Sequence, residues 1–251
     1  MFRILFVFLL LMFVSFMPHS VYGLEVEGVE VSGTSSVDFL THYMWRGQQL
    51  SDKAVIQPVV EITYGGFGFN YWSNYDLHTA EVTETDYTPF YNFQVGKFDF
   101  TLGGIYYSFN EADDTFEFFT SVGYDTFLSP AISAYFDVDE GSGTWLAATI
   151  GHSFDLPYGL ALNLGALVSY NIHHNLVGVD ENGNPFSSFS NAEYSMSLSI
   201  PIWKAISIEP KMAYTHALDD ESRTGFESFS VDPGDKTDSK LYGGFAVSVS
   251  F

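Results

Sequence analysis

The chain of 251 residues contains no cysteine, which excludes disulfide bonds and thiolate metal sites. Basic residues are scarce as well, because 9 Lys and Arg stand against 31 Asp and Glu, for a formal net charge of −22. Such a charge repels nucleic acid phosphates, so we exclude DNA and RNA as partners. It suits cations, or divalent ions that bridge to anionic lipid headgroups. In the alternative, many of these acids have no binding role and only keep exposed loops solvated.

Long apolar runs are missing beyond the N-terminal segment 1–23, MFRILFVFLLLMFVSFMPHSVYG. This segment has Arg3, then an apolar run from Ile4 to about Phe16, then small residues near Gly23, as is typical of a secretory signal peptide. An uncleaved anchor is the alternative, but the run is short for a spanning helix. We therefore predict export, with cleavage after about Gly23, and a single domain over 24–251.

What the chain has instead is alternation of apolar and polar residues with a period of two, which is typical of β-strands. One such segment, 160–172, turns Leu162, Leu164 and Val168 to one face and Asn163 and Asn171 to the other. We count twelve segments: 36–46, 54–64, 67–76, 86–95, 98–109, 115–124, 131–139, 144–154, 160–172, 192–200, 206–216 and 239–251.

The connections between these segments alternate in length. Short turns such as 65–66 and 96–97 follow the even-numbered segments, whereas longer acidic loops, up to 173–191 and 217–238, follow the odd-numbered ones. An even strand count with this asymmetry predicts an all-β fold, a closed antiparallel transmembrane β-barrel with short periplasmic turns and longer extracellular loops. Aromatic residues near the segment ends fit the belts of such a barrel: Tyr64, Tyr75, Tyr107, Tyr124, Trp145, Tyr170 and Tyr214.

The last residues, YGGFAVSVSF, alternate up to Phe251. This ending is similar to the C-terminal signature that the outer-membrane insertion machinery reads. We therefore expect the protein to lie in the cell outer membrane of a Gram-negative bacterium, surrounded by outer-membrane lipid.

Residues 37–76, VDFLTHYMWRGQQLSDKAVIQPVVEITYGGFGFNYWSNYD, resemble the opening strands of the TorF-type porin family, a conserved outer-membrane family of Gram-negative bacteria. The resemblance rests on these positions: Tyr43, Arg46, Gly47, Asp52, Gln57, Pro58, Tyr64 and Trp72. It implies an outer-membrane location and a channel function, and it supplies no substrate.

A lumen formed by twelve strands is narrow, because about 8 strands are just filled by side chains and about 16 to 18 leave a wide pore. Alternation turns an acid-rich set of residues inward, and rings of carboxylates favour cations. We predict a porin-like channel for small polar solutes or cations. The candidate lumen and selectivity residues are Asp38, Arg46, Glu61, Asp86, Glu117, Asp137, Glu193, Glu209 and Lys211. In the alternative, these side chains plug the barrel, which is then a non-conducting receptor or scaffold whose loops 173–191 and 217–238 bind a partner.

Arg46 lies at the end of the first segment. If that strand runs outward, Arg46 points into the outer mouth of the lumen, Tyr43 and Trp45 face lipid, and Gly47 begins the reversal. A buried cation is costly when it is unpaired. We therefore predict an ion pair of Arg46 with Asp86 or Glu117, in preference to an open constriction.

Signals for catalysis are weak. His152 and Ser153 are adjacent, and adjacent strand residues point to opposite faces. The segment 180–184, DENGN, fits an Asn-Gly turn better than a calcium loop, since Pro185 stands where the loop requires glycine. We predict no enzymatic activity, no cofactor and no metal site. An outer-membrane lipid hydrolase is the weakest alternative.

Overall fold

The computed structural model describes residues 24–26, 29–180, 182–229 and 239–251. The predicted signal segment 1–23 lies outside these residues. Within them, the chain forms a closed antiparallel barrel of twelve strands. These strands are β2 (Val29–Leu40), β5 (Val55–Tyr64), β6 (Phe67–Asp76), β7 (Glu81–Val95), β8 (Phe98–Phe109), β9 (Thr115–Tyr124), β10 (Ala131–Asp137), β11 (Thr144–Asp155), β12 (Ala161–Ile172), β13 (Phe189–Trp203), β14 (Ile206–Ala217) and β15 (Ser239–Ser250). The predicted fold class is confirmed.

The barrel closes where the last strand meets the first. Strand β2 pairs with β5 on one side and with β15 on the other, so that Val37 lies opposite both Pro58 and Val247. Gly33 and Phe251 exchange two backbone hydrogen bonds of 2.8 and 2.9 Å and extend this seam. Every barrel strand therefore has two neighbours, and the sheet has no free edge. The short strand β1 (Leu24–Val26) adds to β2 beside the seam.

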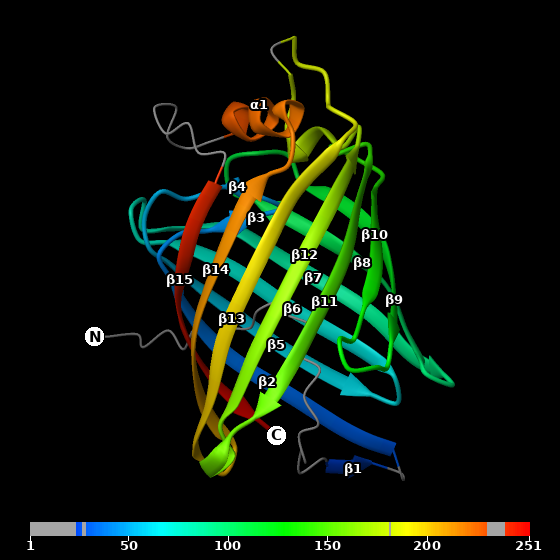
Figure 1. The fold of residues 1–251 in the computed structure, drawn as a ribbon, viewed down its shortest axis with the longest axis vertical. Coiled ribbons are helices and arrows are strands. Elements are labelled where there is room, and N and C mark those ends of the chain that lie inside the picture. The colour runs from blue at the N-terminus through cyan, green and yellow to red at the C-terminus, as the bar shows by residue number, and fades with distance from the viewer. Residues whose placement is uncertain (1–23, 27–28, 181, 230–238) are drawn as a thin grey trace, which may run out of the picture.

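The two ends of the barrel differ as predicted. One end, called the turn end here, has the two-residue turns 65–66 and 96–97. The other, the loop end, has the long connections 41–54, 173–188 and 218–238. Figure 1 shows helix α1 (Asp220–Phe229) over the loop end and the C terminus at the opposite end. Among the described residues, no helix is long and apolar enough to cross a membrane.

The side chains alternate between the outer surface and the lumen. In β12, Leu164 and Val168 are exposed on the outside, whereas Ser169 and Asn171 are buried inside. Large apolar side chains are exposed around the whole outer surface, among them Ile62, Phe69, Leu102, Ile132, Ile150, Met196, Met212 and Phe245.

The structure corrects the prediction for the first strand. Strand β2 ends at Leu40 instead of Arg46, and residues 41–54 fold back into the barrel. They form a small hairpin of β3 (Met44–Trp45) and β4 (Gln48–Gln49). Tyr43 and Trp45 therefore do not face lipid, and Gly47 reverses the chain inside this hairpin instead of between two barrel strands. The alternation of residues 43–46 arises because a hairpin also has two faces.

The expectation that Tyr107 and Trp145 face lipid was also wrong. Tyr107 and Trp145, assigned to the aromatic belt, are only 4% and 7% exposed because they occupy inward positions of β8 and β11. Helix α1 was not predicted at all. Its start does have a sequence signal, because the Asp219 carboxylate accepts the backbone N–H of Ser222 at 2.9 Å and the Ser222 hydroxyl accepts that of Asp219.

Candidate functional site

The candidate site is the hairpin inside the loop end of the barrel, residues 43–50, which we call the plug. Its two arms are joined by a hydrogen bond of 2.8 Å from the Leu50 N–H to the Tyr43 carbonyl. Arg46 and Gly47 form its turn with φ of 50° and 91°, the conformation of a tight hairpin turn. A Cβ atom on Gly47 would lie 2.6 Å from the Phe226 ring of α1. Glycine is thus required at residue 47 by both the backbone and the packed helix.

The turn carries Arg46 to Glu117 on the wall of the barrel. The guanidinium Nη1 and Nη2 atoms each donate a hydrogen bond of 2.7 Å to the Glu117 carboxylate, which is fully buried. The same carboxylate accepts the Tyr107 hydroxyl at 2.7 Å and lies 2.8 Å from Nε2 of His174. Such charge-assisted bidentate pairs fix geometry as well as charge. The predicted pairing of Arg46 is therefore present, with Glu117 as its partner.

Aromatic rings enclose the Arg46 guanidinium. Its Cζ lies 4.4, 4.9 and 4.7 Å from the ring centroids of Trp45, Tyr135 and Trp145. Ring faces at these distances attract a cation. Burial by itself lowers the pKa of Arg46, but the Glu117 carboxylate offsets this effect and raises the pKa above its usual value. Arg46 is therefore a permanent charge inside the barrel.

His174, from the loop between β12 and β13, completes this network. Burial lowers its pKa, so the imidazole is neutral near pH 7. Its Nε2 faces Glu117, and its Nδ1 is buried without a hydrogen-bond partner. The tautomer that fits has the proton on Nε2, donated to Glu117. The main chain of His174 is fixed by Asn171, whose side-chain oxygen accepts the backbone N–H at 3.2 Å.

Glu117, Asp137 and His174 place ligand-type atoms within 4.8 Å of one another. However, the Glu117 oxygens are already taken by Arg46, Tyr107 and His174. Asp137 accepts the backbone N–H groups of Asp139, Gly141 and Ser142 at 2.9 to 3.1 Å and so fixes loop 138–143. A metal ion here would also meet the Arg46 charge. The cluster is thus an ion-pair network and a loop anchor, and it does not fit a metal.

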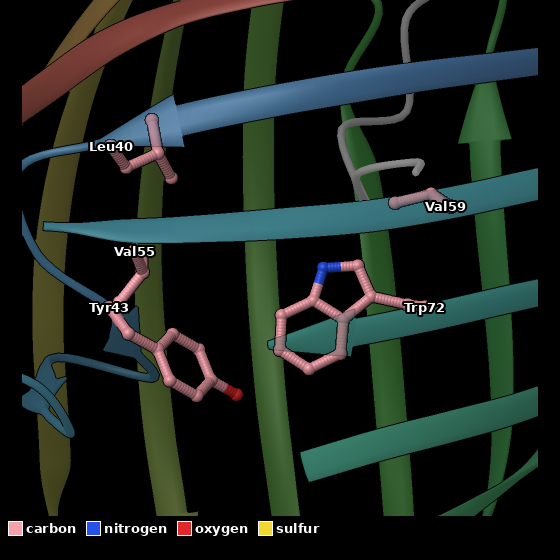
Figure 2. Close-up of a cluster of buried hydrophobic side chains, with 5 residues drawn as sticks. All are labelled: Leu40, Tyr43, Val55, Val59 and Trp72. Carbon is pink, nitrogen blue, oxygen red and sulfur yellow. The ribbon is translucent and has the colours of Figure 1, made fainter. Parts of the chain in front are cut away.

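A second set of contacts holds the base of the plug. Tyr43 donates a hydrogen bond of 2.9 Å to Glu84 on β7, and its ring lies 5.3 Å from that of Trp72. Figure 2 shows these two rings beside the inward side chains of the neighbouring strands, and the buried cluster comprises Leu40, Tyr43, Val55, Val59 and Trp72. This apolar contact fixes the plug to the β2–β5–β6 side of the wall.

The loops at this end cover the plug from outside. Val177 and Phe186 from loop 173–188 and Phe226 from α1 pack with Trp145 in a second buried cluster. Gln48 of the plug donates to the Leu176 carbonyl at 2.8 Å. In the alternative reading, loops 173–191 and 217–238 bind a partner. Among their described residues, Val177, Phe186 and Phe226 instead pack at the loop end of the barrel.

The turn-end half of the lumen is different, because many of its inward side chains are small, polar and partly exposed. Those with this pattern are Thr63, Thr101, Ser121, Ser133, Asn163, Ser197, Ser199, Ser207 and Ser248. Glu61, paired with Asn70 at 3.1 Å, and Asp99 lie among them and are also partly exposed.

Four other predicted lumen residues also have partners, whereas Oδ1 of Asp86, on β7, is buried without a hydrogen bond. Lys211 lies 2.8 Å from Asp38 and 3.6 Å from Glu209. Glu193 accepts the Tyr242 hydroxyl at 3.0 Å. The predicted set is thus divided into several local contacts and does not form one ring.

Sequence reasoning missed two residues that hold the plug. Glu84 precedes Asp86 by one period of alternation and would have been found if the fourth strand had been started at Glu81 instead of Asp86. His174 lies in a loop, where no periodicity indicates which side chains turn inward.

Comparisons with known proteins add little. No family model matches the chain, and no curated protein matches it. Among solved structures, outer membrane phospholipase A from Escherichia coli is 12% identical with a TM-score of 0.45, over 93% of both chains. OccK10 (OpdN) from Pseudomonas aeruginosa is 11% identical with a TM-score of 0.38, over 90% of this chain and 70% of that one. Likenesses this distant carry no argument about function, which must be derived from the site itself.

Proposed function

We propose that the protein is an outer-membrane channel for small cations or small polar solutes, narrowed at its loop end by the plug. The supporting observation is the contrast across the barrel wall. The outer surface exposes large apolar side chains, whereas the turn-end half of the lumen is lined by partly exposed polar ones. An apolar outer surface of this extent is stabilised by contact with lipid, and a polar lumen can be occupied by water and polar solutes. The resemblance of residues 37–76 to the TorF-type porin family supports the same proposal.

The charge of the accessible lumen supports cations as the preferred ions. Glu61, Asp99 and Glu209 are partly exposed to it, whereas Lys211 is held by two of the lumen carboxylates. Fixed carboxylates attract cations and repel anions in a narrow pore.

Bilayer recordings with the refolded full chain under a KCl gradient test this proposal. We expect a reversal potential that favours K⁺. Glu61→Lys and Glu209→Lys should shift the reversal potential toward the anion, while Glu111→Lys on the exposed loop end should shift it less. A wild-type preference for chloride, or no response to the lumen variants, would contradict cation selectivity.

A second candidate is a non-conducting scaffold or receptor. The observation that favours it is the packed loop end, where Trp145, Val177, Phe186 and Phe226 are all buried. A protein that passes no current, with the plug or without it, would be a scaffold. Hydrolysis of phospholipid by the same preparation would instead identify a lipid hydrolase.

A further inference from the structure

Most of the groups that hold the Arg46 guanidinium belong to the barrel wall and not to the plug. Four successive strands, β8 to β11, contribute one inward side chain each, and we call these four side chains the wall cage. They are Tyr107, Glu117, Tyr135 and Trp145. Tyr135 and Trp145 are opposite each other in the β10–β11 register, and Tyr107 donates a hydrogen bond of 2.7 Å to Glu117.

The wall cage is also held in place by contacts that do not involve the plug. The Glu117 carboxylate lies 2.8 Å from Nε2 of His174, in addition to its hydrogen bond within the cage. The Tyr135 ring centroid lies 5.5 Å from that of Trp145 and 5.6 Å from that of Phe119. Groups that are fixed in advance in this way need little reordering when a ligand arrives.

The geometry of the cage selects a guanidinium over other cations. Nη1 and Nη2 of Arg46 donate to Oε1 and Oε2 of Glu117, each at 2.7 Å. Only a planar cation with two parallel N–H groups makes both bonds, whereas an ammonium ion is a compact point charge. The Tyr135 and Trp145 ring centroids, 4.9 and 4.7 Å from Cζ, add the attraction of aromatic faces for the cation.

Arg46 reaches the wall cage from a strained turn. Its φ of 50° lies in the left-handed region, which is unfavourable for a residue with a Cβ atom. The bonds of the guanidinium to the cage offset this cost in the folded protein. A free solute with a guanidinium group makes the same bonds without the strained turn, so it competes with Arg46 for the Glu117 carboxylate.

We propose that the wall cage is a binding site for guanidinium-bearing solutes, and that Arg46 is its tethered occupant while the plug is in place. The inference rests on the channel proposal and names a solute class for it. A small solute with a guanidinium group enters the lumen, takes the place of Arg46 on Glu117 and releases the plug turn.

Thermal unfolding of the refolded Arg46→Ala variant, with methylguanidinium chloride as the probe, tests the binding site. We expect methylguanidinium to raise the unfolding midpoint by on the order of 5 °C at a concentration a hundredfold above its dissociation constant. Methylammonium chloride at the same concentration should give a much smaller shift. No shift with methylguanidinium, or an equal shift with both salts, would overturn the proposal.

Second substitutions in Arg46→Ala locate the site. Adding Glu117→Gln should abolish the methylguanidinium shift, whereas adding Glu111→Gln, at an exposed acid of the loop end, should preserve it. A shift that survives Glu117→Gln would place the solute elsewhere and overturn the proposal. If Arg46→Ala does not fold, replacing residues 44–49 by Gly-Gly removes the same occupant and gives the same decision.

Bilayer recording of the wild type then separates the exchange from the channel proposal. Rising concentrations of methylguanidinium should produce a several-fold, saturable rise in conductance as Arg46 is displaced, and methylammonium should not. A K⁺ current that does not respond to methylguanidinium would overturn the exchange. No current at all would contradict the channel proposal instead, while the unfolding measurements still decide whether the wall cage binds a guanidinium.

Discussion

The two halves of the lumen share the same wall strands but differ in how they handle polar groups. In the loop-end half, Arg46, Glu117 and His174 are buried, Glu117 bonds to both Arg46 and His174, and aromatic rings surround the guanidinium. In the turn-end half, serine, threonine and asparagine side chains are partly exposed and need no such network. The barrel wall alone therefore does not decide which inward side chains are buried; the plug does, because it packs against those of one half only.

If the plug is what blocks the loop-end half of the lumen, its removal should open that half to ions. Replacing residues 44–49 by Gly-Gly should therefore have the largest effect, a several-fold rise in single-channel conductance, because the filled half becomes as open as the other. Bilayer recording measures it. Removal of 182–184, an exposed turn at the same end, is the matched control and should change little. Equal conductance of the wild type and the plug variant would remove the distinction between the halves.

The buried ion pair should contribute more to stability than any exposed acid. Glu117→Gln leaves the Arg46 charge buried without its carboxylate, and we expect a loss of about 3 to 5 kcal/mol in the free energy of unfolding. Urea titration in detergent measures it. Glu111→Gln, an exposed acid at the loop end, should stay within about 0.5 kcal/mol of wild type. Similar losses in both variants would show that Glu117 is not a special position.

Packing of α1 on the plug turn predicts a smaller effect. Gly47→Ala forces an alanine into a left-handed backbone conformation, with φ of 91°, and brings its Cβ against the Phe226 ring. We expect a loss of about 2 kcal/mol in the free energy of unfolding. Gly96→Ala, in a turn at the other end with φ of 64°, shares the backbone strain but meets nothing within 4 Å of the new Cβ. The difference between the two variants measures the contact itself. If they lose equal stability, α1 does not hold the plug turn.

The smallest expected effect is a dependence on pH. Burial lowers the pKa of His174 below its ordinary value of 6.5, so below that pH the unfolded chain binds a proton that the folded chain does not. The stability that neutral His174 contributes is therefore present above pH 6.5 and is lost as the pH falls. Unfolding measured from pH 8 to pH 5 should show a shallower decline for His174→Gln than for wild type. His78→Gln, an exposed histidine, should keep the wild-type slope; if it does not, the decline comes from elsewhere.

The strands were predictable because one physical rule acts along their whole length. Residues 98–109 and 115–124 were predicted to the residue, since an apolar outer surface on one side and the lumen on the other impose a period of two. The same rule did not predict the position of the plug. Tyr43 and Trp45 alternate with polar neighbours whether they meet lipid or a packed interior, and the pattern does not distinguish these two apolar environments.

The candidate site was predictable only in part. Burial of a cation requires a partner, and that requirement was enough to reduce the choices for Arg46 to Asp86 and Glu117. It did not supply Glu84, because the strand was started too late, or His174, because loops have no periodicity. The three rings around Arg46 come from the plug and from two wall strands, so no local pattern indicated them.

The sequence by itself determined the number of strands, the face that each side chain takes and the surplus of acids, because these depend on neighbours one or two residues apart. Only the tertiary structure decided that residues 41–54 enter the barrel and that Arg46 meets Glu117, 71 residues away. The physical reason is that an inward position fixes only the direction of a side chain. Its partner depends on how far each strand is shifted against the next around the whole barrel.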